Sequence, residues 1–153
     1  MGLREILMSA AFAAASSAFL SCAPEEESCD AVEGTYEPLY VALAGNCGAI
    51  APMRLPLDGG AGGVRTNTEM QFGRNIVTMV VHKGCQLRVT QQVMTKEGVL
   101  ESEMNGVDIE VHDAKTLSGQ VDYRRYTPTM DVLCAGTYSA TFTRPDSVNG
   151  IQP

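Results

Sequence analysis

The sequence predicts an all-β domain, an antiparallel meander of about eight strands that forms a small closed or nearly closed barrel. From Gly34 onward, no long window keeps the i, i+3, i+4 apolar spacing of an amphipathic helix, whereas apolar and polar residues repeatedly alternate. Short turn-forming stretches separate the alternating segments. Because short turns join antiparallel neighbours, consecutive strands are expected to pair. A two-sheet sandwich is the second choice of architecture.

The predicted β domain covers residues 34–145, and residues 146–153 are expected to form a flexible C-terminal tail. Asn105-Gly106 predicts a type I′ hairpin turn, because both central residues of that turn need positive φ. The glycine-rich stretch from Leu57 to Val64 predicts a flexible loop. In chain order the candidate strands are Gly34 to Leu43, a loosely defined one within Ile50 to Met70, Arg74 to His82, Cys85 to Met94, Val99 to Met104, Val107 to His112, Thr116 to Arg124, and Val132 to Thr143.

Two similar segments lie at the two ends of this domain. Tyr36 follows a Gly-Thr pair and has Tyr40 four residues later, while Tyr138 follows a Gly-Thr pair and has Phe142 four residues later. On a strand, residues two and four apart share a face, so each segment presents its aromatic rings inward. If the first and last strands pair, the sheet closes and loses its exposed edges.

Residues 1–21 have the pattern of a cleaved signal peptide. The apolar segment from Ile6 to Leu20 would rise about 22 Å as a helix, short of the roughly 30 Å hydrocarbon core of a bilayer. It ends in Phe19-Leu20-Ser21-Cys22, which resembles the lipobox of bacterial lipoproteins: an apolar residue, a tolerant position, a small residue and the cysteine that receives the lipid. The alternative is an ordinary secretory signal cut after Ala23, which gives a freely secreted protein.

The lipobox resemblance implies that Cys22 carries a diacylglyceryl thioether and an acylated amine, with palmitate-type chains that anchor the protein to a lipid bilayer. Ala23 stands where many lipoproteins of the inner membrane have Asp, so the resemblance implies the outer membrane of a Gram-negative cell envelope. Residues 22–33 then form the anchor cysteine and a tether that holds five acids and no Lys or Arg. Self-repulsion is expected to extend this tether.

Composition excludes two broad classes. With 44% hydrophobic and 19% charged residues, the chain is too apolar to be disordered. Eighteen acidic against eleven basic residues give a net charge of −7, and no cluster of Lys and Arg is present to contact phosphates, so nucleic acid is not an expected partner.

Five cysteines are an odd number for a secreted chain, but setting Cys22 aside leaves Cys29, Cys47, Cys85 and Cys134, enough for two disulfides. Cys29 and Cys47 flank one predicted strand, so their Cα atoms would lie far beyond the roughly 7 Å limit for a bridge. If the last strand runs beside the first, Cys134 comes near Cys47, which leaves Cys29 with Cys85. Strict up-and-down alternation of the predicted strands would instead place Cys29 and Cys85 at opposite ends.

The residues needed for an enzyme are scarce, and no cofactor is expected. His82 and His112 are the two histidines, and neither lies in a spacing typical of metal ligands. No Gly-x-Ser-x-Gly nucleophile motif occurs, and the cysteines are assigned to lipid and disulfides. The sequence therefore indicates a non-enzymatic protein.

Four carboxylates would share one outward face around the predicted Asn105-Gly106 turn. In that register Glu103 faces Asp108 and Glu101 faces Glu110. One interpretation is a solvated acidic face that prevents aggregation of the sheet. The other is a weak site for a divalent cation or a basic partner, since Ca²⁺ takes carboxylate oxygens.

The predicted barrel looks like lipocalin-type barrels and other small β domains of envelope lipoproteins. That resemblance implies a binding or structural module that carries a small apolar ligand. The expected lumen is lined by six residues, namely Tyr36, Tyr40, Val121, Tyr123, Tyr138 and Phe142. The alternative is a protein-interaction module, such as an inhibitor or assembly factor on the cell envelope, with a solid interior and an exposed apolar patch that contacts an unknown envelope protein.

Overall fold

The computed structural model describes residues 29–58 and 63–146. The predicted signal peptide, Cys22, most of the tether and nearly all of the predicted C-terminal tail lie outside the described residues, as do Gly59 to Gly62 of the predicted glycine-rich loop. The all-β prediction is confirmed for the described chain, which forms strands β1 (Glu33–Gly45), β2 (Leu55–Asp58), β3 (Gly63–Gln71), β4 (Arg74–Lys83), β5 (Gln86–Met94), β6 (Leu100–Asp113), β7 (Thr116–Tyr126) and β8 (Val132–Thr143). Among these residues we find no helix long and apolar enough to cross a membrane.

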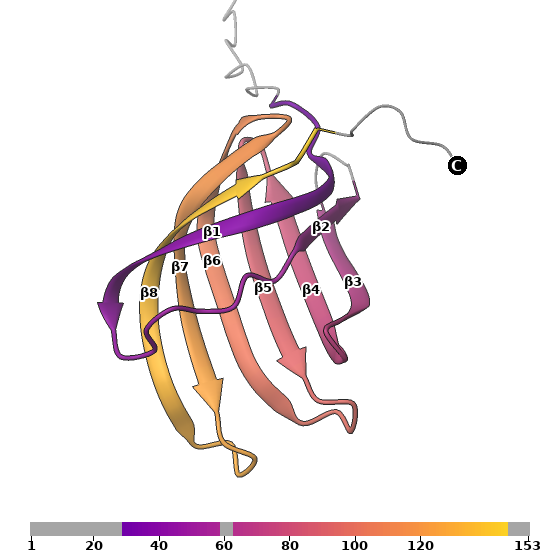
Figure 1. Ribbon diagram of the computed structural model, residues 1–153. Helices are drawn as coiled ribbons and strands as arrows, with labels where there is room; N and C mark the ends of the chain where they lie inside the picture. The colour runs from indigo at the N-terminus through magenta and orange to yellow at the C-terminus, as the bar shows by residue number, and fades with distance from the viewer. Residues whose placement is uncertain (1–28, 59–62, 147–153) are drawn as a thin grey trace, which may run out of the picture.

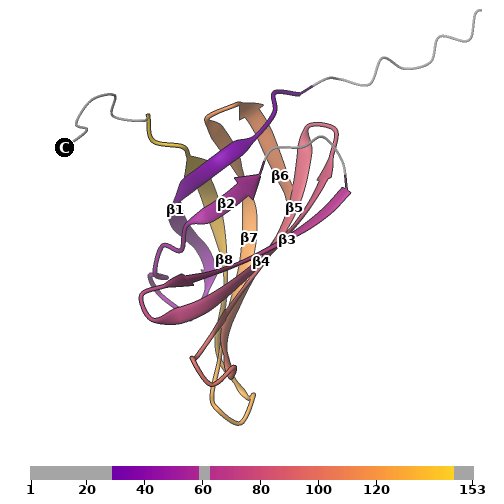
Figure 2. The ribbon, with the colours of Figure 1, turned by 90° about the vertical axis from the view of Figure 1, so that its right-hand side faces the viewer.

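The strands form one antiparallel sheet in the order β2-β1-β8-β7-β6-β5-β4-β3 (Figure 1). From β3 to β8 the sheet is a meander, and the predicted pairing of the first and last strands is confirmed by β1, which lies beside β8 from Glu37 to Gly45. The short strand β2 pairs with the first four residues of β1. The sheet curls until β2 approaches β4, which gives a nearly closed barrel and not a two-sheet sandwich (Figure 2).

The predicted turn at Asn105-Gly106 is wrong, because strand β6 runs straight through it. From the Gly106–Val121 pair to the Glu110–Ser118 pair, β6 advances four residues while β7 advances three, so β6 has a β-bulge. Gly106 does not have positive φ. A Cβ on Gly106 would lie 2.8 Å from Cδ1 of Ile109, so this glycine provides space for a buried side chain.

The loosely defined strand predicted within Ile50 to Met70 is two strands, β2 and β3. One strand more here and one strand fewer at Asn105-Gly106 leave the total at eight. The core lies inside the barrel, and its largest fully buried side chains are Tyr36, Tyr138, Phe142, Leu55, Ile76, Leu87, Ile109 and Leu117.

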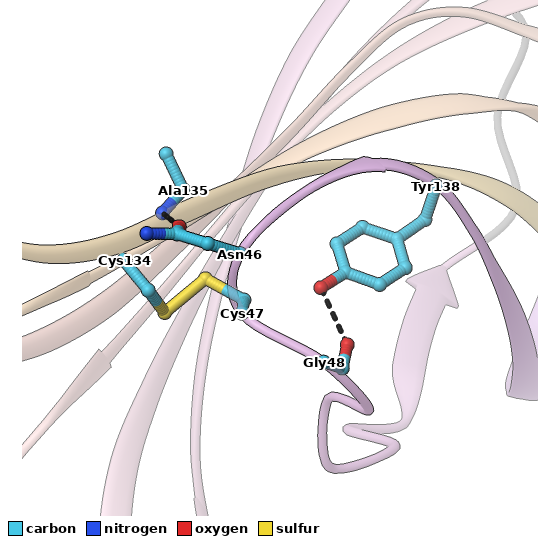
Figure 3. The surroundings of a disulfide bond; sticks show 6 residues. All are labelled: Asn46, Cys47, Gly48, Cys134, Ala135 and Tyr138. Atoms are coloured by element: carbon cyan, nitrogen blue, oxygen red, sulfur yellow. Dashed lines mark hydrogen bonds between the residues drawn. A yellow bond between two sulfur atoms is a disulfide. The ribbon is translucent and has the colours of Figure 1, made fainter.

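Both expected disulfides are present. Cys29 is bonded to Cys85 with a Cα–Cα distance of 5.1 Å, and Cys47 is bonded to Cys134 with a distance of 5.0 Å (Figure 3). Because β2 and β3 are two strands where one was predicted, β4 runs in the direction opposite to the predicted one. Cys85, after the end of β4, therefore lies at the same end of the barrel as Cys29. Val32 is buried in the core, so the described part of the tether is fastened to the barrel and the domain extends at least to Cys29.

Candidate functional site

The six residues predicted to line a lumen do point into the barrel, but most of them form a packed core. Tyr36, Val121, Tyr138 and Phe142 are fully or almost fully buried. Tyr40 packs edge-to-face against Tyr138 and Phe142, with ring centroids 6.4 and 6.2 Å apart. These pairs have the geometry preferred by aromatic rings in protein cores.

The tyrosine hydroxyls in this core have protein partners. Tyr36 donates a hydrogen bond to the carbonyl oxygen of Ala114 at 2.8 Å, and Tyr138 donates one to that of Gly48 at 2.7 Å (Figure 3). The hydroxyl of Tyr40 lies 3.1 Å from the sulfur of Met104. Burial raises the pKa of Tyr40 well above its usual value, and nearby Tyr123 adds to the effect. The phenol of Tyr40 is therefore held neutral inside the barrel.

A small cavity lies between Tyr40 and Tyr123, with a volume of about 30 Å³. A cavity that holds benzene in another protein has about 150 Å³, so this space is too small for an apolar ligand of that size. Its wall is partly polar, because Gln91 and Ser102 contribute to it. A second hollow, of about 360 Å³, is open to solvent and is lined by Asp122, Arg124 and backbone around Gly136, among other residues.

Residues 46–54 cross the open side of the barrel (Figure 1), and Ile50 and Met53 of this segment line the small cavity. The Cys47–Cys134 disulfide and a hydrogen bond of 3.0 Å from the Ala135 amide to the side-chain oxygen of Asn46 fasten the start of this crossing segment (Figure 3). The Asn46 amide also donates a hydrogen bond of 2.9 Å to the Ala135 carbonyl.

Two glutamines fasten the other end of the crossing segment. Gln71 accepts from the Arg54 amide at 3.1 Å, and Gln91 donates to the Arg54 carbonyl at 2.9 Å. Gln71, the last residue of β3, thus connects that strand to the residue before β2, and Gln91 reaches the same residue from β5. The crossing segment is therefore a fixed wall of the barrel.

The four carboxylates predicted to share a face are not brought together in the way the sequence suggested. With no turn at Asn105-Gly106, they lie along the single strand β6. Glu101 pairs with Arg74 of β4, and Glu103 accepts a hydrogen bond of 2.9 Å from Gln92 of β5. Asp108 and Glu110 are exposed beyond the bulge.

Within the described ranges no group of three or more His, Cys, Asp or Glu side chains could hold a metal ion. The cation site depended on the wrong turn, so we do not retain it. Of the two histidines, His112 contacts Ser118 across the β6–β7 pair at 2.6 Å.

The structure draws attention to hairpin turns that the sequence analysis did not single out. We define the proximal end of the barrel as the one that holds the Cys29–Cys85 disulfide and the β4–β5 and β6–β7 turns. The distal end holds the β3–β4, β5–β6 and β7–β8 turns (Figure 1). Six large apolar residues are exposed in or beside the distal turns, namely Met70, Phe72, Val99, Met130, Val132 and Leu133.

Phe72 and Met130 also have an unusual backbone conformation. Phe72 has φ 50° and Met130 has φ 67°, and among the described residues no other non-glycine residue has positive φ. This conformation costs an ordinary side chain roughly 1 to 2 kcal/mol. The exposed fractions are 74% for Phe72 and 52% for Met130. Burial of these side chains therefore does not compensate for the cost of the backbone conformation.

The backbone around Met130 is held in place by a dense set of hydrogen bonds. The Met130 amide donates to the carbonyl of Thr127, and the Thr127 amide donates to that of Asp131, both at 2.9 Å. The hydroxyl of Thr129 donates to the carboxylate of Asp131 at 2.8 Å. The turn therefore presents Met130 in a defined position.

The comparisons with known proteins give no relative. Neither a protein-family model, nor a curated protein, nor a solved structure matches this chain.

Proposed function

We propose that this protein is a lipid-anchored, non-enzymatic interaction module of the cell envelope, held in the outer membrane by acylated Cys22, whose distal turns contact another protein. The single observation that carries this proposal is the conformation of Phe72 and Met130. Both are large, apolar and exposed, and both occupy a backbone region that favours glycine or asparagine.

Both side chains are at least half exposed although their backbone conformation is unfavourable, and a contact function would account for this combination. An Asn at position 72 would fit the two-residue β3–β4 turn better, because Asn-Gly is the preferred pair when both turn residues have positive φ. Apolar side chains on rigid turns are suited to fill pockets on a partner, since little conformational freedom is lost on binding.

The interior supports this proposal over the alternative of a carrier for a small apolar ligand. The buried tyrosines contact one another or the backbone, and the cavity beside Tyr40 has only about 30 Å³. A carrier of the lipocalin type would need space for one ligand inside the barrel.

The anchor is tested by intact mass and membrane fractionation of the full chain from its own host. We expect a mature protein that begins at Cys22, carries acyl chains and fractionates with the outer membrane. Reduction should add four hydrogen atoms, two for each disulfide. A soluble, unacylated product would overturn the anchor and leave a freely secreted interaction protein.

The contact surface is tested by photo-crosslinking in intact host cells. A photoreactive phenylalanine analogue replaces Phe72 or Met130 at the distal end, and Lys83 or Lys115 at the proximal end as the control. We expect one discrete adduct at both distal positions and none at the proximal ones. Equal labelling at all four positions, or none, would contradict the proposal.

A further inference from the structure

Three polar side chains point into the barrel from neighbouring strands. Thr78 of β4, Gln91 of β5 and Ser102 of β6 are only 1%, 3% and 7% exposed. Burial of a polar group costs free energy unless the group forms a hydrogen bond. The hydrogen-bonding atoms of these side chains are therefore expected to have partners.

The protein satisfies the donors of Gln91 but not its acceptor. The amide nitrogen of its side chain donates to the Arg54 carbonyl at 2.9 Å and to the Thr78 hydroxyl at 3.2 Å, which uses both of its protons. No described residue donates a hydrogen bond to the side-chain oxygen of Gln91, and the hydroxyl of Ser102 has no hydrogen-bond partner in residues 29–58 and 63–146. Two polar atoms of buried side chains thus remain without a protein partner.

Gln91 and Ser102 both line the small cavity beside Tyr40. Tyr123 lines the same cavity, and its hydroxyl likewise has no hydrogen-bond partner in the described part of the chain. The cavity volume of about 30 Å³ exceeds the roughly 10 to 15 Å³ that a cavity needs to hold one water molecule. Internal waters bind two to four polar groups, and this cavity offers that number.

We infer that the cavity is a binding site for a single ordered water molecule, held by Gln91 and Ser102. The water donates one proton to the side-chain oxygen of Gln91 and forms a second hydrogen bond with the hydroxyl of Ser102. An apolar occupant would leave both groups without a hydrogen bond. Because Gln91 also binds the Arg54 carbonyl, the water supports the side chain that fastens the end of the crossing segment. The inference does not depend on the acyl anchor or on the distal turns.

A high-resolution crystal structure of the protein purified from its host tests the site directly. We expect a peak of electron density within about 3.2 Å of both the Ser102 hydroxyl and the side-chain oxygen of Gln91. A second crystal under xenon pressure should show no xenon at this position, because xenon enters dry apolar cavities. Absence of the water peak, or xenon in its place, would overturn the inference.

A pair of matched valine variants tests which side chain holds the water. Ser102→Val replaces the hydroxyl with methyl groups inside the cavity and should remove the peak. Ser139→Val makes the same change on the exposed face of β8 and should keep it. In solution, the magnetic relaxation of solvent deuterons should lose the contribution of one long-lived water in Ser102→Val only. A peak that persists in Ser102→Val, or equal loss in both variants, would contradict binding by Ser102.

Discussion

The chain reverses direction between strands at both ends of the barrel, but the turns at the two ends use different residues. At the proximal end the β4–β5 turn has Gly84 at its positive-φ position, and the β6–β7 turn has Asp113 accepting a hydrogen bond of 2.7 Å from the Lys115 amide. At the distal end Phe72 and Met130 take the left-handed conformation. The proximal turns follow local backbone preferences, whereas two of the distal turns go against them.

Under the proposed function, the proximal end is adapted for stability and the distal end for contact with a partner. The proximal end is fixed by the Cys29–Cys85 disulfide and by the hydrogen bond of 2.8 Å from the Tyr36 hydroxyl to Ala114. In and beside the distal turns, large apolar side chains are exposed. Residues that conflict with local preference and are not needed for packing are candidates for function.

The largest expected effect on stability is at the proximal end. Replacing both Cys29 and Cys85 by Ser should lower the free energy of unfolding by roughly 2 to 4 kcal/mol, because the cross-link that restrains the unfolded chain is lost. Denaturant unfolding measures the loss. Distal photo-crosslinking should persist while the variant is folded; its loss would mean that the two ends are not independent.

A smaller effect of opposite sign is expected at the distal end. Phe72→Asn should raise the free energy of unfolding by about 1 kcal/mol, because asparagine tolerates positive φ better than phenylalanine. Thermal unfolding should shift upward by roughly 3 to 6 °C. Lys83→Asn, beside the proximal β4–β5 turn at a position without positive φ, is the control and should give no gain. A destabilised Phe72→Asn variant would show that Phe72 has a structural role.

High pH should act on the buried tyrosines of the core. Burial raises the pKa of Tyr36, Tyr40 and Tyr138, so the folded state keeps phenols neutral that ionise near pH 10 when the chain unfolds. The stability that these neutral phenols contribute is therefore fully present below about pH 10. It is lost as the pH rises through the higher pKa values of the folded state. Absorbance of phenolate should rise together with unfolding. Full phenolate titration of the folded protein near pH 10 would contradict a packed interior.

The smallest effect is expected for the exposed ion pair between Lys115 and Asp146 at the proximal end. The hydrogen bond from Lys115 lowers the pKa of Asp146, but both side chains are largely exposed. Exposed pairs contribute little to stability because solvent screens them. Lys115→Ala should leave the unfolding midpoint in urea unchanged within error, and a clear loss would show that the proximal turn depends on this pair.

Much of the fold could be predicted from the sequence. The alternation of apolar and polar residues depends only on which face of a strand is buried. It was enough to predict an all-β domain in which Tyr36 and Tyr138 point inward. The two strand errors arose where local signals compete with tertiary packing. Asn105-Gly106 has ideal turn chemistry, yet Gly106 lies in a continuous strand because Ile109 packs against it and β5 and β7 pair on both sides.

The two residues proposed to contact a partner, Phe72 and Met130, could not be predicted in the same way. A Phe-Gly pair between polar residues, at positions 72 and 73, is a visible signal once a two-residue turn is placed there. The sequence alone did not reveal that Phe72 takes positive φ, since phenylalanine rarely does. The interior was likewise predicted in outline, but its small remaining volume depends on the crossing segment 46–54, which has no strand periodicity.

The most direct test of the account separates contact from stability in one variant. A photoreactive group at Lys96, whose side chain lies beside Gly73, reports on the distal end in intact host cells. We expect that adding Phe72→Asn and Met130→Asn abolishes the crosslink while the purified protein unfolds at a higher temperature than the wild type. An undiminished crosslink, or a loss that accompanies lower stability, would contradict the claim that these two residues are kept for contact.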